Sequence, residues 1–184
     1  VGGKAFAHDP RTEIGKALTQ AETKKNNGNL ALIRWRDGKT GTVTLKLPIL
    51  GSYSPTAPYD CDKSQRILIE GCKALAAHMK DAGYRPNPIP RSLNALALLA
   101  SGNPAYLPLV KKEAQWAAGF SAGGFQTWYY GYVMMFLAEY TMAAGDDSVV
   151  DGLRRLALEA SNGQSIVGSW GHRFAGEDGR LMGY

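Results

Sequence analysis

Apolar residues recur at helical spacing through most of the chain beyond residue 60. Leu68, Cys72, Leu75 and Met79 lie three or four positions apart, and this spacing predicts a helix over residues 61–82. Further patterns of the same kind predict helices over residues 91–101, 104–118, 126–144 and 148–162. We therefore expect most of the chain to be helical.

Two of the predicted helix pairs resemble each other at a fixed offset. Gly102 aligns with Gly145, and Lys111 and Lys112 align with Arg154 and Arg155, an offset of 43 residues. In both places the glycine is followed by residues that are typical of a helix start. Such self-similarity is typical of stacked helix pairs, because a single pair cannot bury its own apolar face. The pattern predicts a helical repeat array.

The first 49 residues carry a different pattern. Asp9 followed by Pro10 is typical of a helix start. Two β-rich runs, residues 30–36 and 42–47, flank residues 37–40, which begin with Asp-Gly and predict a tight hairpin turn. This part of the chain is therefore expected to contain a strand near residues 1–6, then a helix, and then a β-hairpin.

Prolines interrupt the next segment, residues 48–60, and exclude regular structure from most of it. We therefore expect an α+β chain in three parts. An N-terminal α/β segment occupies residues 1–49, a linker residues 50–60, and a mainly α-helical domain residues 61–184.

Gln164, Gly168 and Trp170 spell Gln-x-x-x-Gly-x-Trp after the second helix pair. This spacing resembles the glutamine–tryptophan repeat of terpenoid cyclases, whose catalytic domains are α/α-toroids. The resemblance implies that Gln164 and Trp170 tie neighbouring helices together. It implies no cyclase reaction, because the acidic clusters of cyclases are not evident in this sequence. A complete toroid has more helices than this chain predicts, so we expect an incomplete, open array or a homo-oligomer.

Residues 1–6 read Val-Gly-Gly-Lys-Ala-Phe, and residues 32–39 read Leu-Ile-Arg-Trp-Arg-Asp-Gly-Lys. With the helix between them, this order resembles the second half of the PDZ domains of bacterial periplasmic and processing proteases. The resemblance implies a partial PDZ-like domain without the loop that binds a peptide carboxylate. Together the two parts resemble bacterial proteins that join a PDZ domain to an α/α-toroid. No reaction is established for those proteins, so the resemblance implies none for this chain.

Both ends of the sequence are expected to continue into a longer protein, and no signal peptide is visible. The PDZ-like resemblance implies that the full-length form is periplasmic or secreted. The missing signal peptide is therefore no evidence for a cytoplasmic protein.

The net charge of +5 comes from the first 49 residues, which hold nine Lys or Arg against four acids. These cations are dispersed rather than interleaved with aromatic residues, so nucleic-acid binding is not expected.

No run approaches the roughly 20 apolar residues that span a bilayer. Cys61 and Cys72 would lie about 16 Å apart on one helix, too far for a disulfide. Neither a metal nor a cofactor is expected, because zinc-ligand spacings and cofactor motifs are not found.

Gly119, Ser121 and Gly123 spell G-x-S-x-G, the pattern of the nucleophile elbow in α/β-hydrolases. An acid, Asp146, Asp147 or Asp151, and then His172 follow in the order that this hydrolase class uses, and Asp146 is the favoured acid. The strand that should precede the serine is missing, because the residues before it read as a helix. A loop between helices is the favoured interpretation. A serine-type ester hydrolase, with Ser121 as nucleophile and His172 as base, is the alternative.

The last third of the chain is rich in aromatic residues, which form either a helical core or the wall of a ligand cavity. Arg173 suits a carboxylate or phosphate. Glu139 interrupts an otherwise apolar helix and would be costly to bury unpaired. The candidate ligand-binding residues are Trp128, Tyr129, Trp170, Arg173 and Glu139.

The function that these patterns favour is a binding or scaffold module for an unidentified small molecule or peptide, with an aromatic-lined helical face. A carbohydrate-active enzyme is a third hypothesis, and it would require Glu139 and Asp146 to face one cavity. A hydrolase would lose its activity on Ser121→Ala, and a carbohydrate enzyme on Glu139→Gln.

Overall fold

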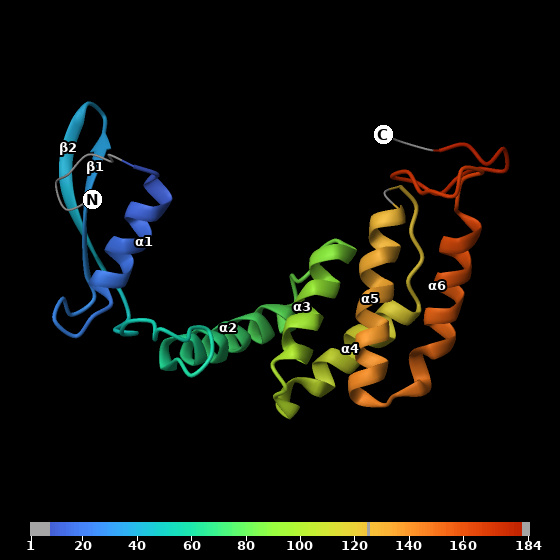
Figure 1. Ribbon diagram of the computed structural model, residues 1–184, viewed down its shortest axis with the longest axis horizontal. Helices are drawn as coiled ribbons and strands as arrows, with labels where there is room; N and C mark the ends of the chain where they lie inside the picture. Colours follow the sequence, from blue (N-terminus) through green and yellow to red (C-terminus); the bar gives the residue numbers. More distant parts are fainter. Residues whose placement is uncertain (1–7, 125, 182–184) are drawn as a thin grey trace. The chain divides into compact units, whose positions relative to one another are not determined.

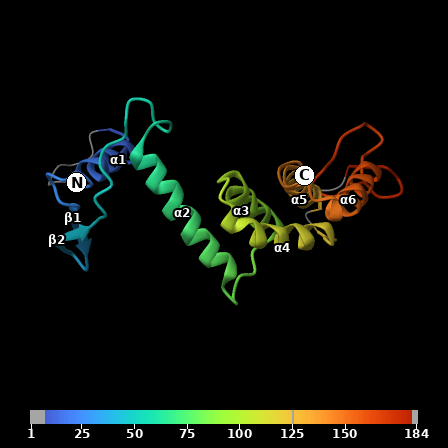
Figure 2. The same cartoon turned by 90° about the horizontal axis from the view of Figure 1, so that it is seen from below.

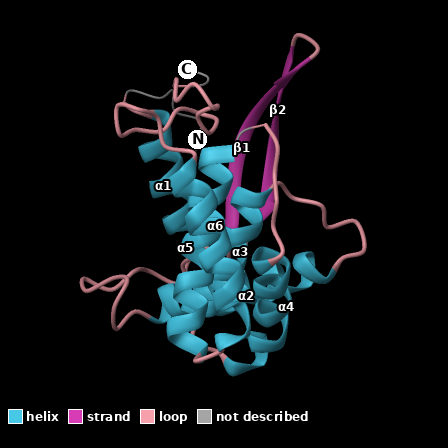
Figure 3. Cartoon of the chain, turned by 90° about the vertical axis from the view of Figure 1, so that its right-hand side faces the viewer, coloured by secondary structure: helices cyan, strands magenta, loops and turns pink. Residues whose placement is uncertain are grey.

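The computed structural model describes residues 8–124 and 126–181 of the 184-residue chain. The described residues form six α-helices and one two-stranded antiparallel sheet, so the chain is α+β and mostly helical, as expected. Figure 3 shows the strands confined to a single hairpin. The strand expected near residues 1–6 lies outside the described residues. The chain divides into two compact units, Val1–Glu70 and Gly71–Tyr184.

The first unit contains helix α1 (Pro10–Ala21) and strands β1 (Asn29–Arg36) and β2 (Lys39–Lys46). The Asp9 side chain caps α1 by accepting a hydrogen bond of 2.9 Å from the backbone N–H of Arg11. Asp37 and Gly38 alone form the hairpin turn, both with positive φ, at 51° and 74°. This turn is two residues long rather than four, because Lys39 and Thr40 already pair with β1.

A close backbone approach at Gly28 joins the helix to the hairpin. Its N–H donates to the Ala21 carbonyl, and its carbonyl accepts from the N–H of Leu47. Gly28 has a φ of +71°, and a Cβ there would lie 2.1 Å from the Leu47 carbonyl oxygen. Only glycine fits this position without moving the backbone.

Helix α2 (Asp62–Lys80) begins in the first unit, and the division between the units falls inside it. The Lys63 side chain is buried and forms an ion pair with Glu22. Its ammonium group also lies 4.4 Å from the centroid of the Tyr53 ring. A buried ammonium requires such partners, so these contacts fix the start of α2 within the first unit.

The second unit contains α3 (Pro88–Ala100), α4 (Leu107–Ala118), α5 (Gln126–Ala144) and α6 (Val150–Asn162). Helices α4 and α5 each pack against α3 and α6 (Figure 1). In Figure 2, α5 and α6 are seen nearly end-on and α4 runs across them. The largest fully buried apolar side chains of this core are Phe136, Leu98, Leu137, Leu156, Val110, Val133 and Val149.

The predicted 43-residue offset is confirmed in the backbone. Gly102 and Gly145 both end a helix region with left-handed φ, at 66° and 61°. Each is followed by a capping side chain and a short 3₁₀ turn, Pro104–Tyr106 in the first pair and Asp147–Val149 in the second. The same local chemistry therefore builds both turns between helices.

Helices α4 and α6 approach closely at Gly152. A Cβ on Gly152 would lie 2.5 Å from the carbonyl oxygen of Ala118 and 2.6 Å from its Cα. Because Gly152 has no side chain, α4 and α6 can pack at this short distance.

A buried ion pair joins α3 to α4. Arg91 donates a hydrogen bond to Glu113, whose side chain is only 3% exposed. The Arg91 guanidinium also lies 3.8 Å from the centroid of the Trp116 ring. Both the carboxylate and the aromatic face satisfy this partly buried cation.

Candidate functional site

Helix α5 is apolar on all sides, yet only one side faces the core. Tyr130, Val133, Phe136, Leu137 and Tyr140 are buried. The opposite side, which we call the α5 strip, consists of Trp128, Gly131, Tyr132, Met135, Glu139 and Met142. A helix that is apolar all round is normally buried all round. The strip instead leaves Trp128 47%, Met135 43% and Met142 72% exposed. Exposed apolar patches on soluble proteins often mark interaction sites.

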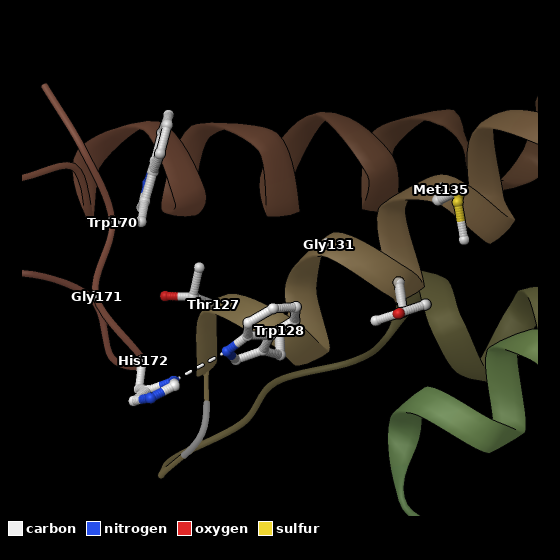
Figure 4. Close-up of a pocket in the computed structure, with 8 residues that line it drawn as sticks. Thr127, Trp128, Gly131, Met135, Trp170, Gly171 and His172 are labelled. Carbon is white, nitrogen blue, oxygen red and sulfur yellow. Dashed lines mark hydrogen bonds between the residues drawn. The ribbon is translucent and has the colours of Figure 1, made fainter. Parts of the chain in front are cut away.

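The first half of the strip forms the floor of a cavity of about 590 Å³. Its wall is the loop segment Trp170, Gly171 and His172, which follows α6 (Figure 4). This volume lies in the usual range for small-molecule sites, and most of the lining is apolar or aromatic. The remaining lining residues are Thr127, Trp128, Gly131, Tyr132 and Met135 of α5.

Gly131 has no side chain and so leaves space open in the floor of the cavity. It lies in the interior of α5, and a Cβ there would meet no atom within 4 Å. Glycine in a helix interior is about 1 kcal/mol less favourable than alanine. No packing contact in the described residues requires glycine here, so the residue leaves open the space that a side chain would fill.

A hydrogen bond between Trp128 and His172 joins the floor to the wall. The indole Nε1 donates to Nδ1 of His172 at 3.0 Å, as Figure 4 shows. The backbone N–H of Thr127 also donates to the His172 carbonyl at 3.3 Å. Because an indole N–H is only a donor, Nδ1 acts as acceptor and the ring proton lies on Nε2. The arrangement assigns the tautomer of His172.

Thr127 contributes a buried hydroxyl. Its Oγ1 finds no hydrogen-bond partner among the described residues. In Figure 4 this oxygen points toward the loop at Gly171. A buried hydroxyl without a partner is costly, and such groups are rare.

The wall of the cavity is fixed by Trp170. Its Nε1 donates a hydrogen bond of 2.7 Å to the Ala160 carbonyl in the last turn of α6. Gln164 instead bonds within its own loop, since its Nε2 donates to the Gly168 carbonyl at 2.7 Å. Of the two residues in the Gln-x-x-x-Gly-x-Trp motif, Trp170 therefore bonds to helix α6, whereas the Gln164 side chain bonds to a residue of the same loop.

The other expected ligand-binding residues lie elsewhere. Tyr129 is partly buried, and its ring packs edge-on against Phe120 with centroids 6.4 Å apart. Arg173 is exposed and does not line the cavity. Glu139 is also exposed, and it lines a second cavity of about 380 Å³ between α3 and α5. Trp128, Trp170 and His172 are therefore the expected residues that the structure brings together.

The expected hydrolase residues are spread over the second unit. Ser121 is exposed in the loop after α4, and its hydroxyl bonds to no described residue. Asp146 follows the last residue of α5, whereas Trp128 and its partner His172 lie at the first turn. A helix of this length separates its ends by about 27 Å. The structure does not bring Asp146 to His172.

Asp146 has a structural environment of its own. It accepts hydrogen bonds from the Ser148 N–H and the Tyr140 hydroxyl, and it pairs with Lys111 at 3.0 Å. The hydrogen bonds from Ser148, then Tyr140 and Lys111, lower the pKa of Asp146. Burial, together with Asp146, raises the pKa of Tyr140 to about 12. Asp146 and Glu139 line different cavities, so they do not form a carboxylate pair at one site.

A polar network around Arg155 holds the loop that carries Ser121. Arg155 donates to the carbonyls of Ala118 and Phe120, at 3.1 and 2.7 Å, and pairs with Glu159 at 2.7 Å. Glu159 also accepts a hydrogen bond from Tyr130, which is the main reason that its pKa is lowered. The sequence pattern did not indicate this network, because its members come from separate segments.

Cys61 lies directly before α2 rather than on it, and both Cys61 and Cys72 are buried free thiols. The Ser54 N–H donates to the Cys61 sulfur at 3.3 Å. Hydrogen bonds from Ser64 and from the Ser54 backbone lower the pKa of this thiol to about 6.

Within residues 8–124 and 126–181, no group of three or more His, Cys, Asp or Glu side chains is placed to hold a metal ion. No helix in the described part of the chain is both long and apolar enough to cross a membrane.

Residues 64–184 match the model of a protein family described as Domain of unknown function (DUF6288). Neither a curated protein nor a solved structure matches the chain. The matched segment contains α3 to α6 and the whole cavity beside Trp128.

Proposed function

The chain belongs to the DUF6288 family, and we propose that its helical unit is a ligand-binding module. The observation that carries the proposal is the cavity of about 590 Å³ between the start of α5 and residues 170–172. Trp128 and Trp170 are each about half exposed at this cavity. Half-exposed tryptophans at a concave apolar surface are typical of binding sites.

The lining determines the chemistry of the ligand. The rings of Trp128 and Trp170, with Met135, suit an apolar or aromatic group. The His172 ring adds polar character to one side of this lining. We propose that such a group enters over Gly131 and lies between the two indoles.

The architecture that supports this module is, we propose, a fragment of an α/α-toroid. Two helix pairs with the same turn chemistry 43 residues apart support it. The order of α1, β1 and β2 supports the corresponding proposal that the first unit is PDZ-like. In this interpretation the repeats form a scaffold, and the loop after α6 completes the site.

Titration with the fluorescent apolar probe 1-anilinonaphthalene-8-sulfonate tests the binding site. The probe is expected to bind the wild-type chain saturably, and Gly131→Leu is expected to weaken binding at least about tenfold by filling the cavity. Gly71→Leu is the matched control, because Gly71 is also an exposed glycine inside a helix with open space around its Cβ. Equal binding by the wild type and Gly131→Leu would exclude this cavity as the site.

A further inference from the structure

The cavity beside Trp128 continues along α5. Met135 lines both this cavity and the second one, so the two are neighbours on one helix face. The second cavity is bounded by Leu96, Leu99 and Ala100 of α3 and by Glu139 and Ala143 of α5. From Thr127 to Ala143 the combined groove spans about 24 Å at 1.5 Å per residue. It is too long for one aromatic group.

Glu139 is the single acidic or basic residue besides His172 among the described residues that line the two cavities. It lies in the second half of the α5 strip and is exposed, and it forms no ion pair with any described residue. The surrounding lining is apolar, so a ligand lying there would partly remove water from its carboxylate. A cationic group on the ligand would compensate for that loss.

The rest of the strip suits a peptide. Met135 and Met142 are 43% and 72% exposed on the same side of α5 as Glu139. Methionine is flexible and polarizable, and it is common on surfaces that accept varied apolar side chains. A groove lined by Met135, with a tryptophan pocket and one acid and with Met142 exposed beyond it, matches recognition of a peptide through spaced apolar anchors.

We propose that the groove binds a peptide segment that carries an apolar or aromatic anchor and a basic residue, with the basic residue at Glu139. This inference rests on the proposed binding function and adds the class of ligand. The anchor enters the cavity over Gly131, and the peptide then follows α5 past Met135 to the carboxylate.

The geometry also predicts the spacing within the peptide. Gly131 and Glu139 are about 12 Å apart along the helix axis. An extended peptide covers this distance in about four residues, and a helical peptide in about eight. A basic residue at one of these positions after the anchor is therefore expected to bind more tightly than one at other positions.

The test uses acetylated and amidated peptides with one tryptophan anchor and one lysine, placed four or eight residues later in a Ser/Ala spacer. Norleucine replaces lysine in the matched peptides, and binding is measured by calorimetry. Lysine at one of the two positions is expected to improve affinity about two- to fivefold over norleucine. That preference should disappear in Glu139→Gln and persist in Asp151→Asn, which removes an exposed acid on α6.

Three outcomes would overturn the proposal. In the first, lysine gives no preference at either position, and in the second the preference survives in Glu139→Gln. In the third, light scattering shows wild-type self-association that Met142→Asp abolishes, which would assign the strip to a second copy of the chain. Binding of 1-anilinonaphthalene-8-sulfonate separates the two proposals. If the probe binds the wild-type chain and Gly131→Leu weakens it, but lysine gives no preference that depends on Glu139, only the peptide inference fails.

Discussion

Replacing Gly152 by alanine tests the close packing of α4 and α6. The added methyl carbon would lie 2.5 Å from the Ala118 carbonyl oxygen and 2.6 Å from both Cα and Cβ of Ala118. Two of these three atoms are backbone, so rotation of a side chain cannot relieve the overlap. The helices must separate by about 1 Å to restore normal contacts. That movement also disturbs the hydrogen bond from Arg155 to the Ala118 carbonyl.

The net cost follows from two opposing effects. Overpacking of this kind costs about 1–3 kcal/mol, plus a contribution from the weakened Arg155 contact of about 1 kcal/mol. Alanine has a better helix propensity than glycine, and this offsets about 1 kcal/mol. We therefore expect a net loss of about 2 kcal/mol in the free energy of unfolding. For a chain of this size, that loss lowers the melting temperature by about 4–8 °C.

Urea denaturation followed by circular dichroism measures this loss. Gly71→Ala and Gly131→Ala are matched controls, because both glycines lie inside helices and their Cβ positions are in open space. Each control is expected to gain about 0.5–1 kcal/mol from helix propensity alone. A stabilised Gly152→Ala, similar to the controls, would refute the inference that glycine sets the distance between α4 and α6.

Two further predictions concern buried and titrating groups. Arg91→Ala leaves the buried Glu113 carboxylate without its cation and is expected to cost about 3–5 kcal/mol of unfolding free energy, against less than about 1 kcal/mol for the exposed Arg154→Ala. Similar urea midpoints for both would contradict the role of that pair. The Cys61 thiol is expected to ionise with a pKa of about 6, seen as thiolate absorbance near 240 nm, and Ser64→Ala should raise this pKa. Because folding lowers the pKa, the thiolate contributes stability at high pH that is lost as pH falls through about 6.

Local chemistry made the helix boundaries predictable. The Asp9-Pro10 start of α1 and the left-handed glycines after α3 and α5 are short-range signals that act within a few residues. The bounds predicted for α5 agree with the structure at both ends. The predicted start of α3 was wrong, because Asn87 caps the helix and α3 begins at Pro88, three residues before the predicted start at residue 91.

The exposed face of α5 could not be read from the same pattern. Periodicity shows which sides of a helix are apolar, and α5 is apolar on nearly every side, so the pattern does not indicate which side is covered. Which side is covered depends on where α3, α4 and α6 pack. The Arg155 network was missed for the same reason, since its contacts with Phe120 and Tyr130 arise only when three segments meet.

The candidate site was partly predictable. Trp128, Trp170 and His172 were expected from their residue types, and the structure brings all three to one cavity. Tyr129 is adjacent to Trp128 in the chain but points to a different side of the helix, where it packs against Phe120. The order of Ser121, Asp146 and His172 resembled a triad, but order along the chain carries no information about distance across a helix.

The loop from Trp170 to His172 links the end of α6 to the beginning of α5. Trp170 bonds to Ala160, and the His172 carbonyl accepts from Thr127, so a bound molecule touching both residues would fasten the end of α6 to the start of α5. Binding to the folded state alone raises its stability by about 2.7 kcal/mol at a ligand concentration one hundred times Kd. That gain corresponds to about 5–11 °C in melting temperature for a chain of this size. A heat-denaturation screen of a chemically diverse collection would therefore identify ligands of this loop by the rise in melting temperature that they cause.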